Sequence, residues 1–301
     1  MLISISISCE KDPPNNMSWT TYTTNNGLAE NRILSMAKDP SGTMWFGTAD
    51  SGVSKFNGEN WITYNESCCN IGNTITDITI DKHGVIWFAT NKGLSQFNGT
   101  NWISINIGLE GLTSSPISLA FDNNGVLWIG SVDGLFKYDG NIWNKFLENK
   151  LINDIAIEGN IIWAGTSGDG LFKYENNIWT SFNTTNSSIP HNYILTIDVD
   201  NSGNKWFGTN KGVIKYDGKK WVVYNMENSN IAHDWIFSSI LDKYGNYWIG
   251  TSDGISKFNG KSWTTYKTTD GLANNNVEAI CIDNLNNKWF GTSNGVSKLS
   301  D

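Results

Sequence analysis

The chain has 301 residues, a formal net charge of −8 and 39% hydrophobic residues. Its 21 Lys and Arg residues never form a run longer than two, whereas nucleic-acid binding relies on clustered basic side chains, so this partner class is excluded. No apolar stretch approaches the length of a membrane-spanning helix. We therefore expect one domain with a substantial core and no nucleic-acid partner.

The first 17 residues differ in composition from the rest. They begin MLISISISCEKDPPNN, an uncharged apolar stretch ending in Ser8-Cys9 and followed by a polar, proline-containing tether. This resembles the end of a bacterial lipoprotein signal peptide, which implies lipidation of Cys9 and a periplasmic or cell-surface location. The alternative is a terminal segment without a role. We place the domain at residues 18–301.

Tryptophan marks a repeat of about 40 residues. The tryptophans form two series. Each member of the first series is the first residue of a W-x-G-T sequence or a close variant of it, and within a repeat the tryptophan of the second series follows 15 or 16 residues later. The first series is Trp45, Trp87, Trp128, Trp163, Trp206, Trp248 and Trp289, and the second is Trp19, Trp61, Trp102, Trp143, Trp179, Trp221 and Trp263. Only Trp235 stands outside both series. Such a period indicates a propeller or a similar array.

Each repeat predicts four short strands. In residues 33–64, apolar and β-branched runs are separated by the turn sequences DPSG, DSG and NG. We predict an all-β, seven-bladed β-propeller of four-stranded antiparallel blades. The chain ends at a third strand, so residues 18–23 should complete the last blade and close the ring without a free edge.

An aspartate lies six residues before the first tryptophan in six blades, and blade four lacks it. We interpret it as an Asx-turn residue, because a role that recurs in nearly every blade is structural. Asp198 and Asp200 give one copy a partial calcium-loop pattern without the distal acidic ligand. We predict no metal and no cofactor. Beyond these turns, we expect no concentrated set of acidic residues, and we expect the blade strands to be apolar on both faces.

Four cysteines are present, and no C-x-x-C pair occurs among them. Cys68 and Cys69 are adjacent, and we expect two free thiols in a loop, with a vicinal disulfide as the alternative. Cys281 falls in a predicted strand and is expected to fill the core.

The repeat resembles that of the bacterial two-component regulator propellers. The resemblance rests on the octapeptide DGLANNNV at 270–277, WFGT at 289–292 and GVSK at 295–298, and it extends over about residues 18 to 300. In that family such propellers are extracytoplasmic ligand-sensing modules, often two in tandem before a membrane helix and a histidine kinase. The resemblance implies a sensor-like or binding propeller, which we expect to be monomeric.

The loops between blades vary at the third and fifth positions of a repeated hexamer, and variable positions on a constant scaffold can encode specificity. A carbohydrate or peptide could bind there by ring stacking and hydrogen bonding. The alternative is that these side chains merely pack on neighbouring loops. The candidate ligand-binding residues are Glu30, Arg32, His191, Tyr193, His233, Asp234, Trp235, Asn274 and Asn276.

Two other functions stay open. The repeat loosely resembles the seven-bladed streptogramin-type lyases, in which case His191 and His233 could supply a base or a metal ligand. His83 belongs to a turn at the opposite face, and no G-x-S-x-G, H-E-x-x-H or P-loop pattern occurs. We therefore predict no catalytic residues. The third possibility is a scaffold that docks another protein.

Overall fold

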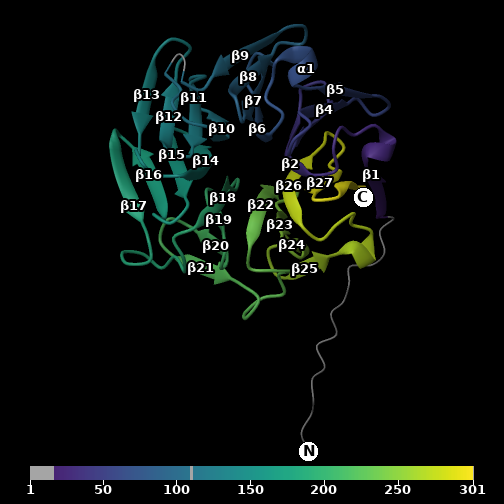
Figure 1. The fold of residues 1–301 in the computed structure, drawn as a ribbon. Helices are drawn as coiled ribbons and strands as arrows, with labels where there is room; N and C mark the ends of the chain where they lie inside the picture. Colours follow the sequence, from purple (N-terminus) through teal and green to yellow (C-terminus); the bar gives the residue numbers. More distant parts are fainter. Residues whose placement is uncertain (1–16, 109–110, 301) are drawn as a thin grey trace, which may run out of the picture.

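The chain forms a ring of seven four-stranded antiparallel sheets around a central channel (Figure 1). This computed structural model describes residues 17–108 and 111–300. Cys9 and the rest of the predicted tether lie outside the described residues. The predicted seven-bladed propeller of four-stranded antiparallel blades is confirmed.

Blades one to six each use four consecutive strands, whereas blade seven combines both ends of the chain. The strands of blades one to three are β2 (Ile33–Lys38), β3 (Met44–Thr48), β4 (Val53–Phe56), β5 (Trp61–Tyr64), β6 (Ile75–Ile80), β7 (Ile86–Thr90), β8 (Gly93–Phe97), β9 (Trp102–Asn106), β10 (Pro116–Phe121), β11 (Leu127–Ser131), β12 (Gly134–Tyr138) and β13 (Trp143–Phe146). Those of blades four to seven are β14 (Ile152–Glu158), β15 (Ile161–Thr166), β16 (Leu171–Glu175), β17 (Ile178–Phe182), β18 (Ile194–Val199), β19 (Lys205–Thr209), β20 (Gly212–Tyr216), β21 (Trp221–Tyr224), β22 (Ile236–Leu241), β23 (Tyr247–Thr251), β24 (Gly254–Phe258), β25 (Trp263–Tyr266), β26 (Val277–Ile282), β27 (Lys288–Thr292), β28 (Gly295–Ser300) and β1 (Ser18–Tyr22). The short helices are α1 (Glu66–Cys69) and the 3-10 turns Thr24–Asn26 and Thr268–Asp270.

The first strand closes the ring as predicted. β1 pairs antiparallel with β28 over its whole length, with Trp19 opposite Leu299. The Trp19 ring also contacts Phe290 of the same blade and Tyr266 of blade six, at centroid distances of 5.8 and 6.2 Å. Blade seven therefore joins the N-terminal strand to the C-terminal hairpin, and no blade is left incomplete.

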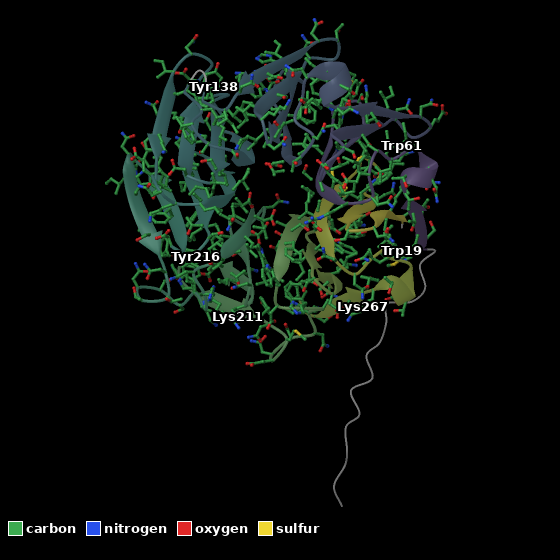
Figure 2. All side chains as sticks on the ribbon, viewed as in Figure 1. Trp19, Trp61, Tyr138, Lys211, Tyr216 and Lys267 are labelled. Carbon is green, nitrogen blue, oxygen red and sulfur yellow. A yellow bond between two sulfur atoms is a disulfide. The ribbon has the colours of Figure 1, made fainter. Side chains whose placement is uncertain are left out.

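The two tryptophan series occupy different depths. The first lies in the second strand of each blade, where all five residues of β3, for example, are buried. The second lies in the outer strands, where Trp19 and Trp61 are seen toward the rim of the ring (Figure 2). In blades one to six the outer tryptophan contacts the aromatic residue opposite it in the third strand, as Trp221 does with Tyr216 at 4.0 Å. These aromatic contacts fill the space between blades, because each blade has a neighbour on both faces.

The predicted Asx turns are confirmed, and the aspartate has an additional role. Asp39 Oδ1 accepts the backbone N–H groups of Ser41 and Thr43, while its Oδ2 accepts the Trp45 indole N–H at 3.1 Å. The same aspartate–indole bond recurs in blades three, five, six and seven. The carboxylate thus connects the turn before the second strand to the ring buried beneath it.

Blade four replaces this turn with a tight reversal, as its shorter spacing predicts. β14 and β15 pair up to Glu158 and Ile161. Glu158 then substitutes for the missing aspartate, because its Oε2 accepts the Trp163 indole N–H at 3.0 Å. Its other oxygen accepts a hydrogen bond from Lys205 of blade five at 2.8 Å.

The expectation of free thiols at Cys68 and Cys69 is wrong: the two sulfurs form a disulfide. The residues also lie in α1 instead of a loop, because Asn65 caps this helical turn through the Ser67 and Cys68 backbone N–H groups. Cys281 is buried in the core as predicted.

Within the described part of the chain, no helix is both long and apolar enough to cross a membrane.

Deleting residues 1–24 should lower the melting temperature by on the order of 10 °C, because the burial of Trp19 and Tyr22 is lost and β28 becomes an open edge. The measurement is thermal unfolding followed by circular dichroism. Deleting residues 1–16 leaves β1 in place and is the control. Equal melting temperatures for the two truncations would contradict closure by β1.

Asp242→Ala should destabilise the fold by about 1–3 kcal/mol more than Asp217→Ala does. Asp242 is only 3% exposed and holds both its turn and the Trp248 indole, whereas Asp217 accepts only the turn N–H groups of Lys219 and Lys220. Urea unfolding of both variants measures the difference. Equal losses would show that the indole bond adds nothing.

Candidate functional site

The channel contains a cavity of about 210 Å³ at the face where the inner strands begin. The inner strands are β2, β6, β10, β14, β18, β22 and β26, and the loops between blades lead directly into them. Each inner strand has a β-bulge after its first residue, as between Ile75 and Asp77 of β6. A bulge bends the strand and redirects a side chain.

Two positions of the repeat determine the cavity wall. The bulged residue contributes Leu34, Thr76, Ile117, Asn153, Leu195, Phe237 and Glu278, and the following residue contributes Ser35, Asp77, Ser118, Asp154, Thr196, Ser238 and Ala279. Met36, Ser239 and Ile280 complete the lining. No Lys, Arg or His belongs to this lining, although Arg32 at its edge bonds one of the three carboxylates, Glu278.

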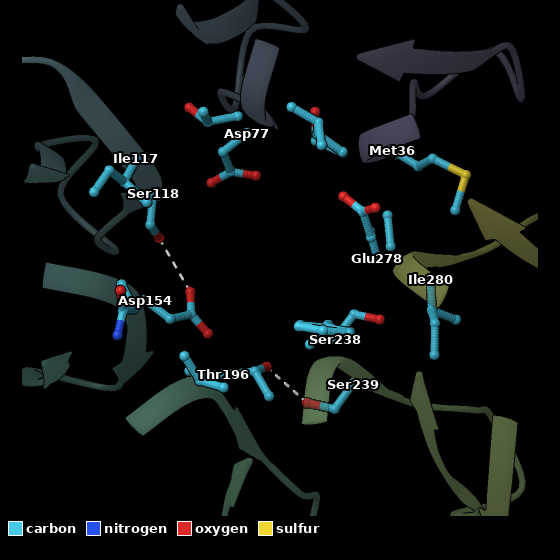
Figure 3. A pocket seen from close by; sticks show the side chains of 17 residues that line it. Met36, Asp77, Ile117, Ser118, Asp154, Thr196, Ser238, Ser239, Glu278 and Ile280 are labelled. Carbon is cyan, nitrogen blue, oxygen red and sulfur yellow. Dashed lines mark hydrogen bonds between the residues drawn. The ribbon is translucent and has the colours of Figure 1, made fainter. Parts of the chain in front are cut away.

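Figure 3 shows Asp77, Asp154 and Glu278 directed toward the open centre from three different blades. Burial raises the pKa of Asp77 from 3.8 to about 6, although the Leu119 and Ile78 N–H groups favour its charged form. Burial raises the pKa of Asp154 to about 7, and the nearby charges of Asp77 and Asp198 contribute to that rise. Desolvation therefore disfavours the ionised forms of Asp77 and Asp154.

A third, partly buried aspartate, Asp198, lies between blades five and six. Its Oδ2 accepts a hydrogen bond from the Ser239 hydroxyl, which also contacts Thr196 Oγ1 at 2.7 Å. Burial raises the pKa of Asp198 to about 6, while the Ser239 and Tyr247 hydroxyls favour its charged form. Burial together with the Asp198 charge also raises the pKa of Tyr247 well above its usual value.

The expectation of no concentrated acidic set is therefore wrong, as is the expectation that all blade strands are apolar on both faces. The second strands match it, but the inner strands present polar side chains to the channel and to the next blade. A sequence signal exists in the residue that follows the bulge, since it is Asp in two repeats and Ser, Thr or Ala in the others.

The predicted site residue Arg32 lies at the edge of this cavity. Its guanidinium bonds Glu278 across the junction of blades one and seven, with Nε 3.1 Å from Oε1. Asn276 donates to the same carboxylate at 2.9 Å and to Ser293 at 2.5 Å. Arg32 and Asn276 thus fix Glu278 in the wall.

His191 and His233 are engaged by their own loops. Nδ1 of His191 accepts the Tyr193 backbone N–H at 3.2 Å, and Nδ1 of His233 accepts the Trp235 N–H at 3.0 Å. Asn274 accepts the Asn276 N–H in the same way at 2.8 Å. With Nδ1 used as an acceptor, the neutral imidazole carries its proton on Nε2 and presents a donor.

Tyr193 and Trp235 point outward at the fifth hexamer position, with 42% and 47% of their surfaces exposed. The Tyr193 ring contacts His191 at 5.3 Å, and the Trp235 ring contacts Phe237 of the cavity wall at 5.9 Å. Among the described residues, no hydrogen bond, ion pair or ring contact joins the pair His191 and Tyr193 to the pair His233 and Trp235.

The remaining predicted residues support the loops. Glu30 Oε2 accepts the Asp50 N–H at 2.7 Å. Asp234 Oδ1 accepts the Met226 N–H at 2.7 Å, and its carbonyl oxygen accepts the Gly212 N–H at 2.8 Å. Over residues 17–108 and 111–300, no group of three or more His, Cys, Asp or Glu side chains is arranged to hold a metal ion.

Residues 27–50 and 71–92 match the family model described as "Two component regulator propeller". No curated protein matches the chain in sequence.

Several solved structures share the fold. The extracellular domain of the putative hybrid two component system BT3049 from B. thetaiotaomicron superposes with a TM-score of 0.82 and 23% identity, over 93% of this chain and 40% of that one. The corresponding domain of BT4673 from the same organism gives 0.77 and 20%, over 94% and 39%. The chain therefore spans about two fifths of these relatives.

A virginiamycin B lyase from Staphylococcus aureus, in a catalytically inactive form with quinupristin, gives a TM-score of 0.79 and 14% identity, over 95% of this chain and 99% of that one. Likenesses at these identities show the fold alone, and the two matched segments add the repeat family. The chain is a seven-bladed β-propeller, and two of its segments, residues 27–50 and 71–92, match the repeat of the two-component regulator propellers.

Proposed function

We propose that this chain is a non-catalytic, extracytoplasmic binding propeller of the sensor type, which takes a carbohydrate or peptide at the channel mouth. The observation that supports it is the exposure of Tyr193 and Trp235 on the inter-blade loop face, with Trp235 continuing the wall of the cavity through Phe237. Exposed aromatic rings beside polar groups suit sugar rings and peptide side chains.

The geometry of the histidines supports binding over catalysis. An imidazole whose Nδ1 accepts a backbone N–H offers Nε2–H as a donor to a ligand hydroxyl or carbonyl. A general base or a metal ligand needs a free lone pair on a ring nitrogen. Here the lone pair of Nδ1 is used by the backbone N–H and Nε2 carries the proton, so either role would require breaking the Nδ1 hydrogen bond or removing the Nε2 proton.

The location rests on the BT3049 and BT4673 likenesses, both to extracellular domains. We include in the proposal the predicted lipid anchor at Cys9. Cys9→Ser should move the protein from the membrane fraction to the soluble fraction of cells, measured by immunoblot. A wild-type protein that is already wholly soluble contradicts the anchor but not ligand binding.

The binding test uses glycan and peptide arrays with the double variant His233→Ala, Trp235→Ala. Binding should weaken at least about tenfold, which corresponds to about 1.4 kcal/mol. Tyr244→Ala is the matched control, because Tyr244 is 69% exposed and lies in the turn between β22 and β23, at the opposite face. Equal binding by the double variant and wild type would exclude the patch.

The lyase alternative is favoured only by the virginiamycin B lyase likeness and by His191 and His233 on one face. Incubation with quinupristin, followed by mass spectrometry, tests it, with and without a chelator. If quinupristin is converted and the chelator abolishes the conversion, the protein is a metal-dependent lyase and the binding proposal is wrong. A co-purified protein that dissociates from the double variant would instead indicate a docking scaffold.

A further inference from the structure

We propose that the channel cavity binds a primary alkylammonium group, with Asp77 and Asp154 as the side chains that hold the ammonium. The inference rests on the proposed binding function and deepens it, since it specifies the part of the ligand that enters the channel below the mouth. The lysine side chain of a peptide and a free alkylamine share this chemistry, and the experiments below distinguish the two sources.

The cavity wall changes from apolar to polar with depth. The bulged residue of each inner strand lies nearer the mouth, because the strand starts at that face, and in four blades it forms an apolar collar of Leu34, Ile117, Leu195 and Phe237. All four are half-buried. The residue one step deeper is an aspartate or carries a hydroxyl in six blades, as Ser35, Asp77, Ser118, Asp154, Thr196 and Ser238. An entering side chain therefore meets the collar first and the carboxylates behind it.

Asp77 and Asp154 are held in fixed orientations. Each carboxylate accepts the backbone N–H of the following residue and one from the inner strand of the next blade, Ile78 and Leu119 for Asp77, and Ile155 and Ile197 for Asp154. Asp154 also accepts the Ser118 hydroxyl at 3.0 Å (Figure 3). These donors favour the ionised form, which has about four acceptor sites, so each carboxylate keeps the capacity for a further donor.

The two aspartates lack a countercharge. Glu278 has one, because Arg32 bonds it, and Asn276 and Ser293 donate to the same carboxylate. Over residues 17–108 and 111–300, no Lys, Arg or His forms a hydrogen bond or ion pair with Asp77 or Asp154. The charge of Asp77 contributes to the raised pKa of Asp154, so the two carboxylates are near enough to repel one another. An ammonium between them would supply the missing positive charge.

Size and shape favour an alkylammonium over other cations. The cavity volume of about 210 Å³ is below the ~300–1,000 Å³ of a site that encloses a whole small molecule, so it suits one end of a ligand. A lysine side chain has an apolar four-carbon stem for the collar and a compact ammonium whose protons all donate. A metal ion fits less well, because in the described part of the chain no group of three or more His, Cys, Asp or Glu side chains is arranged to hold one.

The collar is continuous with the proposed mouth site. Phe237 lines the cavity, and its ring centroid lies 5.9 Å from that of the exposed Trp235. A peptide that contacts Trp235 can therefore direct a neighbouring side chain past Phe237 toward the two carboxylates.

The test measures the affinity of Nα-acetyl-lysine N-methylamide by isothermal titration calorimetry, with the norleucine compound as the matched uncharged ligand. At pH 8 the carboxyl groups of Asp77 and Asp154, with pKa values of about 6 and about 7, are ionised, while the lysine ammonium keeps its proton. Wild type should bind the lysine compound at least about tenfold more tightly than the norleucine compound, because its hydrogen bonds to the carboxylates are charge-assisted.

The double variant Asp77→Asn, Asp154→Asn should bind the two compounds about equally. Asp154→Asn alone replaces it if the double variant does not fold, and should reduce the lysine preference by at least about threefold. Asp50→Asn, at an exposed aspartate of the same face, is the control and should keep the wild-type preference.

Pentylamine and a peptide with a central lysine distinguish the two sources. Tighter binding of the peptide that is lost in Trp235→Ala identifies a peptide ligand, whereas equal affinity for pentylamine identifies a free amine. Equal affinities of wild type for the lysine and norleucine compounds would overturn the inference and leave the proposed function intact. Array binding that is the same in wild type and in His233→Ala, Trp235→Ala would overturn the proposed mouth site, even if the lysine preference is present.

Discussion

Adjacent blades approach closely where a small residue of one second strand meets the first residue of the next inner strand. A Cβ added at Gly47 would lie 2.7 Å from Ile75 Cγ2, and one at Gly291 would lie at the same distance from Ile33 Cγ2. The second contact joins blade seven to blade one. Because it occurs all around the ring, this spacing fixes where the inner strands stand, and hence the width of the channel.

The position of the inner strands determines the chemistry of the channel. Each strand enters from an inter-blade loop and bulges after one residue, so two consecutive side chains are directed to the cavity or to the next blade. The propeller can therefore change the lining of its channel by substitutions at two positions without disturbing the packed second strands. Asp77, Asp154 and Glu278 occupy these variable lining positions, whereas the second strands behind them keep the same packed pattern in every blade.

The candidate mouth shows a similar division within one loop. The third and fourth hexamer positions stabilise the loop, since His233 accepts the Trp235 N–H and Asp234 accepts the Met226 N–H. The fifth position is directed outward in Tyr193 and Trp235. Variation at the third position thus preserves an acceptor for the loop, whereas variation at the fifth changes the exposed surface.

The sequence by itself determined the blade number, the four strands per blade, the closing strand and the turn aspartates. Each of these depends on short-range patterns that repeat, such as the distance from Asp39 to Trp45. It also indicated the face on which Trp235 is exposed. Only the tertiary structure decided that the charges of Asp77 and Asp198 act on Asp154, because these residues are far apart in the chain and are brought near one another by the packing of their blades. The bulge in each inner strand also kept the sequence from predicting these positions. It shifts the alternation of inward and outward side chains by one residue, so a side chain within an apolar run is directed toward the channel.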